Sequence, residues 1–290
     1  MVKTFFKLLL ATVLYTLLFL LANAILPFSQ EFKDLGSFGN PMALLLIFFS
    51  NAWACFTIYF IIKHTHYYGV KLFVNTFCVM FFIHYFMTQI ETLFFGFAFT
   101  VLTVLDIILM MLAGLLALLG ATALLVRLFP YSNVEYKNNK LCIKDTMVKL
   151  GIIGIVYLCI YMIFGYFVAW QFEDLRLFYT GSTEKLSFWG QIANNIKTNP
   201  IIIPFQILRG ILFGSAIIPI KNMVNRNKLI FIICVCLIYL CIAIGLIVPN
   251  VLFPDIVRIA HLIEMISSML LFGIIVGIIM WNIESKKTST

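Results

Sequence analysis

Charge is the property that this sequence most lacks: only 11% of its 290 residues are charged, while 63% are hydrophobic. An ordinary soluble domain has about a quarter charged residues. The chain therefore has too few charges to cover the surface of one or two soluble domains. Disorder is excluded as well, because it requires low hydrophobicity and high net charge. The composition predicts a helical multi-pass membrane protein.

Motifs that would assign a chemistry directly are also missing. The sequence has neither a Gly-x-Ser-x-Gly nucleophile motif nor a His-Glu-x-x-His zinc motif. It has no phosphate-cradling glycine loop and no strand pattern of aromatic and basic residues, so no nucleic-acid partner is expected despite the net charge of +8. None of the seven cysteines falls in a predicted outside loop, which argues against a structural disulfide.

Long apolar stretches dominate what is present. Crossing about 30 Å of hydrocarbon takes roughly 20 mostly apolar residues in a helix. We predict an all-α polytopic transmembrane bundle forming a single integral membrane domain over residues 1–290. Its spans are predicted at 5–26, 41–62, 72–95, 98–126, 147–169, 200–220, 229–249 and 255–282.

The first stretch has an alternative interpretation. Lys3 and Lys7 precede an apolar run that ends in Ala22-Asn23-Ala24, a sequence typical of a signal-peptide cleavage site. An uncleaved helix is preferred, because the run is long enough to span a membrane. Cleavage would leave seven spans with the same sidedness.

The basic residues predict how the spans are oriented. Lys and Arg accumulate in cytoplasmic loops, and five basic residues on one side face fourteen on the other. The fourteen are Lys3, Lys7, Lys63, Lys71, Arg127, Lys137, Lys140, Lys144, Lys149, Lys221, Arg226, Lys228, Lys286 and Lys287. We predict a cytoplasmic (cell) membrane protein with both termini inside, whose basic face attracts anionic membrane lipids.

Two loops stand out in this topology. The loop at about 127–149 is basic and predicted to be cytoplasmic. The loop at about 170–199 is predicted to be extracytoplasmic. Its aromatic residues, among them Trp170 and Trp189, favour the headgroup interface, so part of it is expected to lie along the membrane as an anchor or lid.

Charged and polar residues inside the spans are the candidate functional residues, because hydrocarbon excludes them unless they face a protein interior and have partners. Helical spacing places them on shared stripes. The stripes are His84, Thr88 and Glu91 in the third span, Gln206 and Arg209 in the sixth, and Arg258, His261 and Glu264 in the eighth; Gln89 and Asp106 lie nearby.

These residues share a depth in the outer half of the predicted bundle, and their charges nearly cancel. We predict a polar pocket walled by the third, fourth, sixth and eighth spans, with Asn51 and Trp53 at a compatible depth and Trp170, Gln171 and Arg176 at the rim. The predicted catalytic residues are His261, Glu264 and Glu91, which would handle protons. The predicted substrate-binding residues are Arg209, Arg258, Gln206, Gln89 and Asp106.

The leading hypothesis is that the pocket binds a small or lipid-linked polar substrate, for transport or membrane-lipid chemistry. Paired arginine forks suggest an anionic group on that substrate. One alternative is a metal-dependent intramembrane hydrolase, in which His84, Glu91, His261 and Glu264 hold a divalent metal; otherwise no cofactor is expected. The other alternative is a structural or partner-binding subunit, whose buried ion pairs lock helix packing. The sequence leaves enzyme activity and oligomeric state open.

Overall fold

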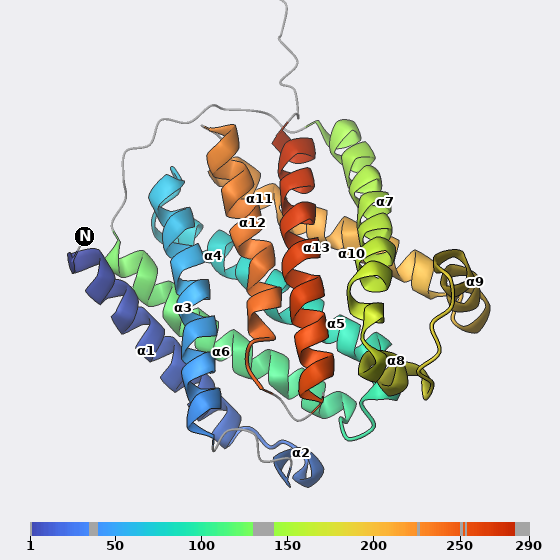
Figure 1. The fold of residues 1–290 in the computed structure, drawn as a ribbon. Coiled ribbons are helices and arrows are strands. Elements are labelled where there is room, and N and C mark those ends of the chain that lie inside the picture. The colour runs from blue at the N-terminus through green and yellow to red at the C-terminus, as the bar shows by residue number, and fades with distance from the viewer. Residues whose placement is uncertain are drawn as a thin grey trace, which may run out of the picture.

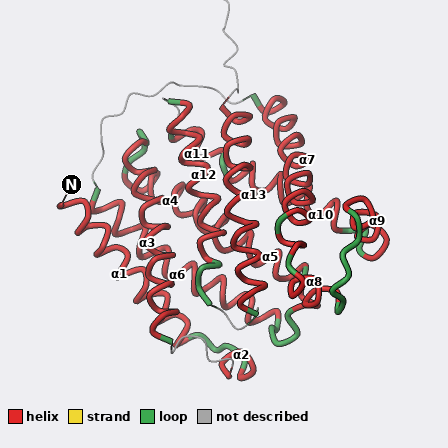
Figure 2. The backbone as a smooth tube through the Cα atoms, viewed as in Figure 1, coloured by secondary structure: helices red, strands yellow, loops and turns green. Residues whose placement is uncertain are grey.

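A computed structural model describes residues 2–34, 40–129, 142–224, 227–249, 252 and 254–281. Within these ranges the chain forms helices joined by turns, and no residue there belongs to a strand. Figures 1 and 2 show the helices gathered into one bundle, with the long helices side by side. The predicted all-α fold is confirmed for this part of the chain.

Eight helical segments are long and apolar enough to cross a membrane, and they match the predicted stretches in number and order. They are α1 (Val2–Ile25), α3 (Pro41–His64), the third segment (Gly69–Phe94), α6 (Val104–Leu128), the fifth (Ile143–Gln171), the sixth (Ile202–Met223), α12 (Lys228–Gly245) and α13 (Asp255–Trp281). Large apolar side chains such as Phe5, Leu17, Ile259 and Ile274 cover their outer faces. A soluble monomer does not expose apolar surface on this scale, so the chain is a multi-pass membrane protein.

Two of the eight segments are internally broken. The third consists of α4 (Gly69–Phe81), the π-helix η2 (Phe82–Phe86) and α5 (Met87–Phe94). The sixth consists of α10 (Ile202–Ala216) and α11 (Ile218–Met223), and Pro219 lies in the first turn of α11. Proline lacks a backbone donor and is tolerated in a first turn, so it marks the restart of the helix. Pro204 likewise lies in the first turn of α10.

Shorter elements close one end of the bundle. They are α2 (Gln30–Asp34), the 3₁₀ turns η3 (Gly96–Ala98) and η4 (Ala169–Gln171), α8 (Glu173–Thr180) and α9 (Phe188–Thr198). The predicted loop at about 170–199 thus contains α8 and α9. We call this the α8 end; α2 and α8 lie at the bottom of Figure 1. The basic loop predicted at about 127–149 lies partly outside the described residues, which omit 130–141.

Helices pack both against the next span in the chain and against spans distant in sequence. α1 packs on α6 and α3, α12 on α13 and α3, and α7 (Ile143–Phe167) on α10 and α13. At the end opposite α8, the Lys7 ammonium donates a hydrogen bond to the Leu128 carbonyl at 2.7 Å, and Lys221 donates to the Trp281 carbonyl at 2.8 Å. The first bond joins the start of α1 to the end of α6, and the second joins α11 to the end of α13.

Charge differs sharply between the two ends. The end opposite α8, which we call the basic end, carries one described acid, Asp145, and the basic residues Lys3, Lys7, Lys63, Lys71, Arg127, Lys144, Lys149, Lys221 and Lys228. The α8 end carries the basic residues Lys33, Arg176, Lys185, Lys197 and Arg258. Its acids are Glu31, Asp34, Asp106, Glu173, Asp174, Glu184 and Asp255. The basic excess predicted from the loops therefore gathers at one end of the folded bundle.

Candidate functional site

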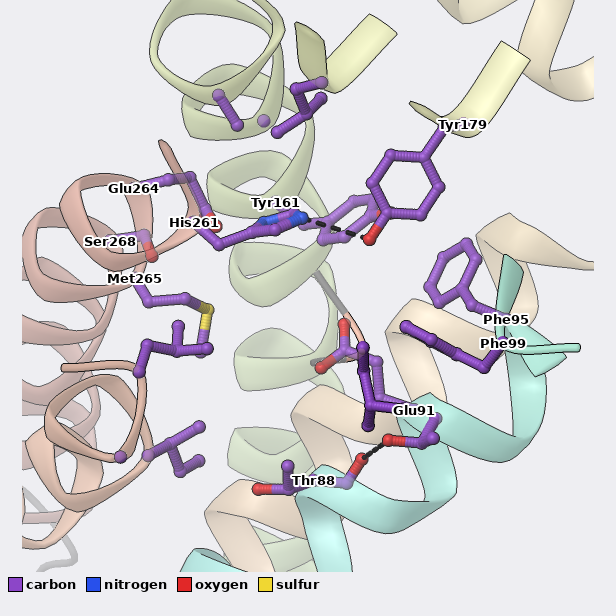
Figure 3. A pocket seen from close by; sticks show the side chains of 18 of the residues that line it. Thr88, Glu91, Phe95, Phe99, Tyr161, Tyr179, His261, Glu264, Met265 and Ser268 are labelled. Atoms are coloured by element: carbon purple, nitrogen blue, oxygen red, sulfur yellow. Dashed lines mark hydrogen bonds between the residues drawn. The ribbon is translucent and has the colours of Figure 1, made fainter. Parts of the chain in front are cut away.

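A cavity of about 610 Å³ lies in the half of the bundle toward the α8 end. Its wall is formed by the first half of α3, the region from η2 to the end of α5, the second half of α7 and the first half of α13. α8 and α9 also contribute. Most of the wall is apolar or aromatic, and Figure 3 shows Phe95, Phe99 and Met265 in it. A large, mostly apolar cavity with a few polar groups is the usual form of a small-molecule site.

Glu91 and Arg209 form a two-pronged ion pair beside this cavity. The Arg209 Nη1 donates to Glu91 Oε1 at 2.7 Å and Nη2 donates to Oε2 at 2.6 Å. Nη1 also donates to Oε1 of Gln206 at 3.0 Å, one turn earlier on α10. The pair joins α5 to α10 across 118 positions of sequence. Arg209 is only 1% exposed, so its charge depends on this carboxylate.

The π-helix η2 precedes Glu91 on the same segment. The hydrogen bonds of a π-helix span one residue more than those of an α-helix, and single π-helical turns often occur at functional sites. In η2 and α5 it accompanies a set of polar side chains that line the cavity: His84, Thr88, Gln89, Glu91 and Thr92. The His84 Nδ1 and the Gln89 Oε1 are buried and accept or donate no hydrogen bond within the described part of the chain. Two residues of the cavity wall thus each have a polar atom without a partner among the described residues.

Glu264 and His261 enter the cavity from α13. Glu264 is 8% exposed, lines the cavity, and forms no ion pair with any Lys or Arg of the described ranges. Ser268 lies next to it, one turn further along the same helix face. The His261 Nε2 lies 3.0 Å from the Tyr179 hydroxyl, as the dashed line in Figure 3 shows.

Tyr179 belongs to α8 and connects this helix to α13. The Tyr179 hydroxyl is the α8 partner of His261, and the Tyr179 ring packs near Trp170 and Phe95. Burial and, next, the Glu91 carboxylate raise the pKa of the Tyr179 phenol, so it keeps its proton at neutral pH. α8 thus covers the cavity with a neutral hydrogen-bonding group.

Arg176 fixes α8 in place. Its Nη1 donates to the Trp170 carbonyl at 2.6 Å and its Nε to the Thr183 carbonyl at 2.7 Å. The side chain is buried, and its Nη2 lies 3.9 Å from Oε1 of Glu173. Arg176 and Gln171, both predicted at the rim, do not line the cavity, whereas Trp170 does. The role of Arg176 is to hold the two ends of α8 together.

Two predicted substrate-binding residues lie elsewhere. Asp106 caps α6: it accepts hydrogen bonds from Thr103 and from the backbone and hydroxyl of Ser29. Arg258 donates to Asp255 and to the carbonyls of Leu246 and Ile247. Neither residue lines the cavity. Both have a partner in the first turn of their own helix and further partners in a neighbouring loop.

The structure does bring most of the other predicted residues together. Glu91, His261, Glu264, His84 and Gln89 all line one cavity. Gln206 and Arg209 lie directly behind Glu91 rather than in the wall. Among the residues that the structure describes, no three His, Cys, Asp or Glu side chains gather as ligands for a metal ion, so the set His84, Glu91, His261 and Glu264 does not converge on one point.

The wall differs from the predicted one in its helices. The fourth and sixth spans contribute only Met110 and Ile202, whereas the second contributes Ile47, Ser50 and Asn51. Trp53 instead donates to the Leu237 carbonyl. The fifth span contributes Tyr157 and Tyr161, which the sequence analysis did not single out. No sequence signal distinguishes these two tyrosines from the many other aromatic residues of the spans.

The arrangement offers two kinds of chemistry. Glu264, His261 and the Tyr179 hydroxyl can bind, hold or pass protons in a mostly apolar site. The apolar wall can hold a hydrocarbon chain. One architecture hosts many activities, so the fold itself does not assign a function. No protein-family model, curated protein or solved structure matches this chain.

Proposed function

We propose that this multi-pass membrane protein binds a lipid-linked or otherwise amphipathic polar substrate in the cavity, for transport or membrane-lipid chemistry. One observation carries the proposal: a cavity of about 610 Å³ sets Glu91, His261, Glu264 and Tyr179 into an otherwise apolar wall. The apolar wall suits a hydrocarbon chain. The polar residues suit the group attached to that chain.

The proposed roles follow from the partners of each residue. His261 and Glu264 handle protons or hydrogen-bond the polar group of the substrate, since both face the cavity. Glu91 is held by Arg209 and Gln206, so it contributes a fixed carboxylate at one edge. Tyr179 places α8 over the polar group of the substrate and orients the His261 ring.

The cavity is proposed to open toward one side of the membrane. Tyr157, Phe213, Tyr239 and Phe272 pack ring against ring in the core, and all four are buried. This packing closes the bundle between the cavity and the basic end. A cavity open to one side fits substrate capture from one leaflet.

The charge asymmetry supports a location in the cell membrane with the basic end in the cytoplasm. The α8 end and the cavity would then face the outer leaflet and the extracytoplasmic side. The substrate would reach the cavity from that leaflet.

The buried pair of Arg209 and Glu91 favours a second function, that of a structural or partner-binding subunit. Breaking such a pair strongly destabilises a protein, so part of the polar cluster serves helix packing. Glu264 distinguishes ligand binding from a structural function, because it has no ion-pair partner among the described residues. A packing role would not explain its position in the cavity wall.

The test compares what copurifies with three forms of the protein: wild type, Glu264→Gln and Glu184→Gln. Glu184 is exposed on the loop after α8, so its substitution removes a carboxylate away from the cavity. Native mass spectrometry of each form, followed by lipid extraction, identifies bound molecules. We expect one class of amphipathic molecule on the wild type and the Glu184→Gln form, and its loss from a folded Glu264→Gln form. Equal occupancy in all three, or loss of folded protein in Glu264→Gln, would favour the structural function.

A further inference from the structure

The charges around the cavity are unbalanced. Its wall contains two carboxylates, Glu91 and Glu264, and no Lys or Arg among the residues described. The sequence-based hypothesis expected Arg209 and Arg258 to hold an anionic group, and the structure places neither guanidinium in the wall. An incoming phosphate or carboxylate would meet carboxylates there.

Arg209 and Arg258 each already bind a carboxylate. Arg209 donates to both oxygens of Glu91 and to Gln206. Arg258 donates to Asp255 and to two backbone carbonyls. An anion that bound either guanidinium would compete with a carboxylate that the guanidinium already holds, and in Arg209 only the buried Nε has no hydrogen-bond partner among the described residues.

Glu264 is the carboxylate that lacks a cation. It is 8% exposed and lines the cavity without an ion pair to the described Lys and Arg residues. Glu91 acts on it electrostatically, and Arg209 acts on it with the opposite sign. A buried carboxylate without a partner is costly. A cation or a proton arriving from the cavity removes that cost.

Aromatic rings surround the same space. Tyr179 lies with its ring centroid 6.4 Å from those of both Trp170 and Phe95, and Tyr161 lines the same cavity. Faces of such rings attract ammonium groups, and aromatic cages with a nearby carboxylate are a recurring way to bind them. The geometry combines both elements at one end of an apolar cavity.

We infer that the polar group of the ligand is a cation, an ammonium group attached to an apolar chain, bound between Glu264 and the aromatic side chains Tyr161, Tyr179, Trp170 and Phe95. This inference rests on the proposed function and names its substrate class. The apolar chain lies along the remaining wall, which includes Met265 and Phe99. Two rival occupants of Glu264 are a proton, which would leave the ligand uncharged, and a free small amine without a chain.

The experiment uses three photoreactive probes with the same dodecyl chain and diazirine, differing only in the head: a primary ammonium, a hydroxyl or a sulfonate. The full chain is labelled in maltoside micelles, which carry no charge. Displacement by excess unlabelled amphiphile measures saturable binding, and peptide mapping locates the labelled residues. Butylammonium serves as a competitor that has the head group without the long chain. Wild type is compared with Glu264→Gln and Glu184→Gln.

We expect the ammonium probe to label α7 and α13 saturably, and to bind about tenfold or more tightly than the hydroxyl probe. Glu264→Gln should reduce ammonium binding to the level of the hydroxyl probe, while Glu184→Gln changes nothing. Displacement by dodecylammonium but not by butylammonium supports a chain-bearing ligand. Equal displacement by dodecylammonium and butylammonium would support a cationic ligand but contradict the inference that the ligand carries a long apolar chain.

The remaining outcomes separate the inference from the proposed function. Equal binding of the hydroxyl and ammonium probes shows a protonated Glu264 and overturns the inference, while the cavity remains a binding site. Preferred binding of the sulfonate overturns it in favour of an anion. No saturable labelling by any probe contradicts the proposed function itself. The comparison of the three probe head groups on the wild-type protein needs no variant. It therefore tests whether the ligand is a cation even where Glu264→Gln does not fold.

Discussion

Two glutamates at the same cavity have different surroundings, and their surroundings separate their roles. Glu91 binds Arg209 through both carboxylate oxygens, and its side chain is 29% exposed. Glu264 is more deeply buried and has no such partner in the described ranges. Removing Arg209 would leave the Glu91 charge uncompensated, whereas removing the Glu264 charge leaves nothing uncompensated. Stability should therefore depend on the first pair, and ligand binding on Glu264.

Arg209→Met tests this division. Breaking one partner of a buried pair costs about 3–5 kcal/mol, so the variant should lose most of its folded protein or unfold at a much lower temperature. Arg209→Met combined with Glu91→Gln should recover a large part of the loss, because no buried charge then lacks a partner. Thermal unfolding in detergent measures both.

Lys197→Met is the matched control, since Lys197 is exposed at the end of α9 and surface charges contribute little. It should unfold close to the wild-type temperature. A wild-type melting temperature for Arg209→Met would show that the pair does not hold α5 to α10.

At the scale of helices, α7 and α10 approach each other through glycines. A Cβ atom added at Gly210 would lie 2.8 Å from the Gly154 Cα and 2.5 Å from the Tyr157 Cβ. Small residues allow membrane helices to pack this closely. Arg209 precedes Gly210 in the chain, so the same contact sets how far the guanidinium reaches toward Glu91. Helix packing and the site are coupled at this point.

Gly210→Ala should therefore be destabilising despite the greater helix propensity of alanine, which is worth up to about 1 kcal/mol. Overpacking typically costs about 1–3 kcal/mol. Gly151→Ala on α7 is the control, because nothing lies within 4 Å of its added Cβ, and it should be neutral or mildly stabilising. Thermal unfolding of the two variants gives the comparison. Equal stability of the two would show that α7 and α10 separate without cost.

For a physical reason, the sequence predicts where each span lies better than it predicts which spans touch. Hydropathy is a property of contiguous residues, so the ends of the eight predicted segments lie within six residues of the observed ends. Contacts such as Glu91 with Arg209 join residues 118 positions apart, and helical spacing gives only depth and face. The contribution of Tyr157 and Tyr161 to the wall depends on which helices touch.

Some local contacts were readable from the sequence. Thr103 and Asp106 have the spacing of a capping box, which the structure contains. Asp255 and Arg258 are also three apart, the spacing of neighbours on a helix surface, and they pair at 2.9 Å. These spacings indicate charges that have a partner within their own helix turn. The two spacings distinguish Asp106 and Arg258 from charged residues that need a partner on another helix.

At the scale of the whole molecule, the unequal ends give the orientation its physical basis. The basic end carries a large excess of Lys and Arg, while acids outnumber basic residues at the α8 end. Lys and Arg near span ends are retained in the cytoplasm and are attracted to anionic lipid headgroups there. In the proposed orientation the basic end lies in the cytoplasm, so the cavity would face the extracytoplasmic side and take its ligand from the outer leaflet.

Cysteine labelling on intact cells tests the orientation. Cys142 is exposed at the start of α7, at the basic end, and a cysteine placed by Glu184→Cys in a Cys142→Ser background would lie at the α8 end. A charged, membrane-impermeant maleimide should label Glu184→Cys in intact cells and the native Cys142 only after permeabilisation. Exposed Cys78 and Cys159 lie along spans, where a charged reagent does not enter, and Cys142→Ser alone gives the background. Labelling of Cys142 in intact cells would reverse the orientation, and the cavity would then draw its ligand from the cytoplasmic leaflet.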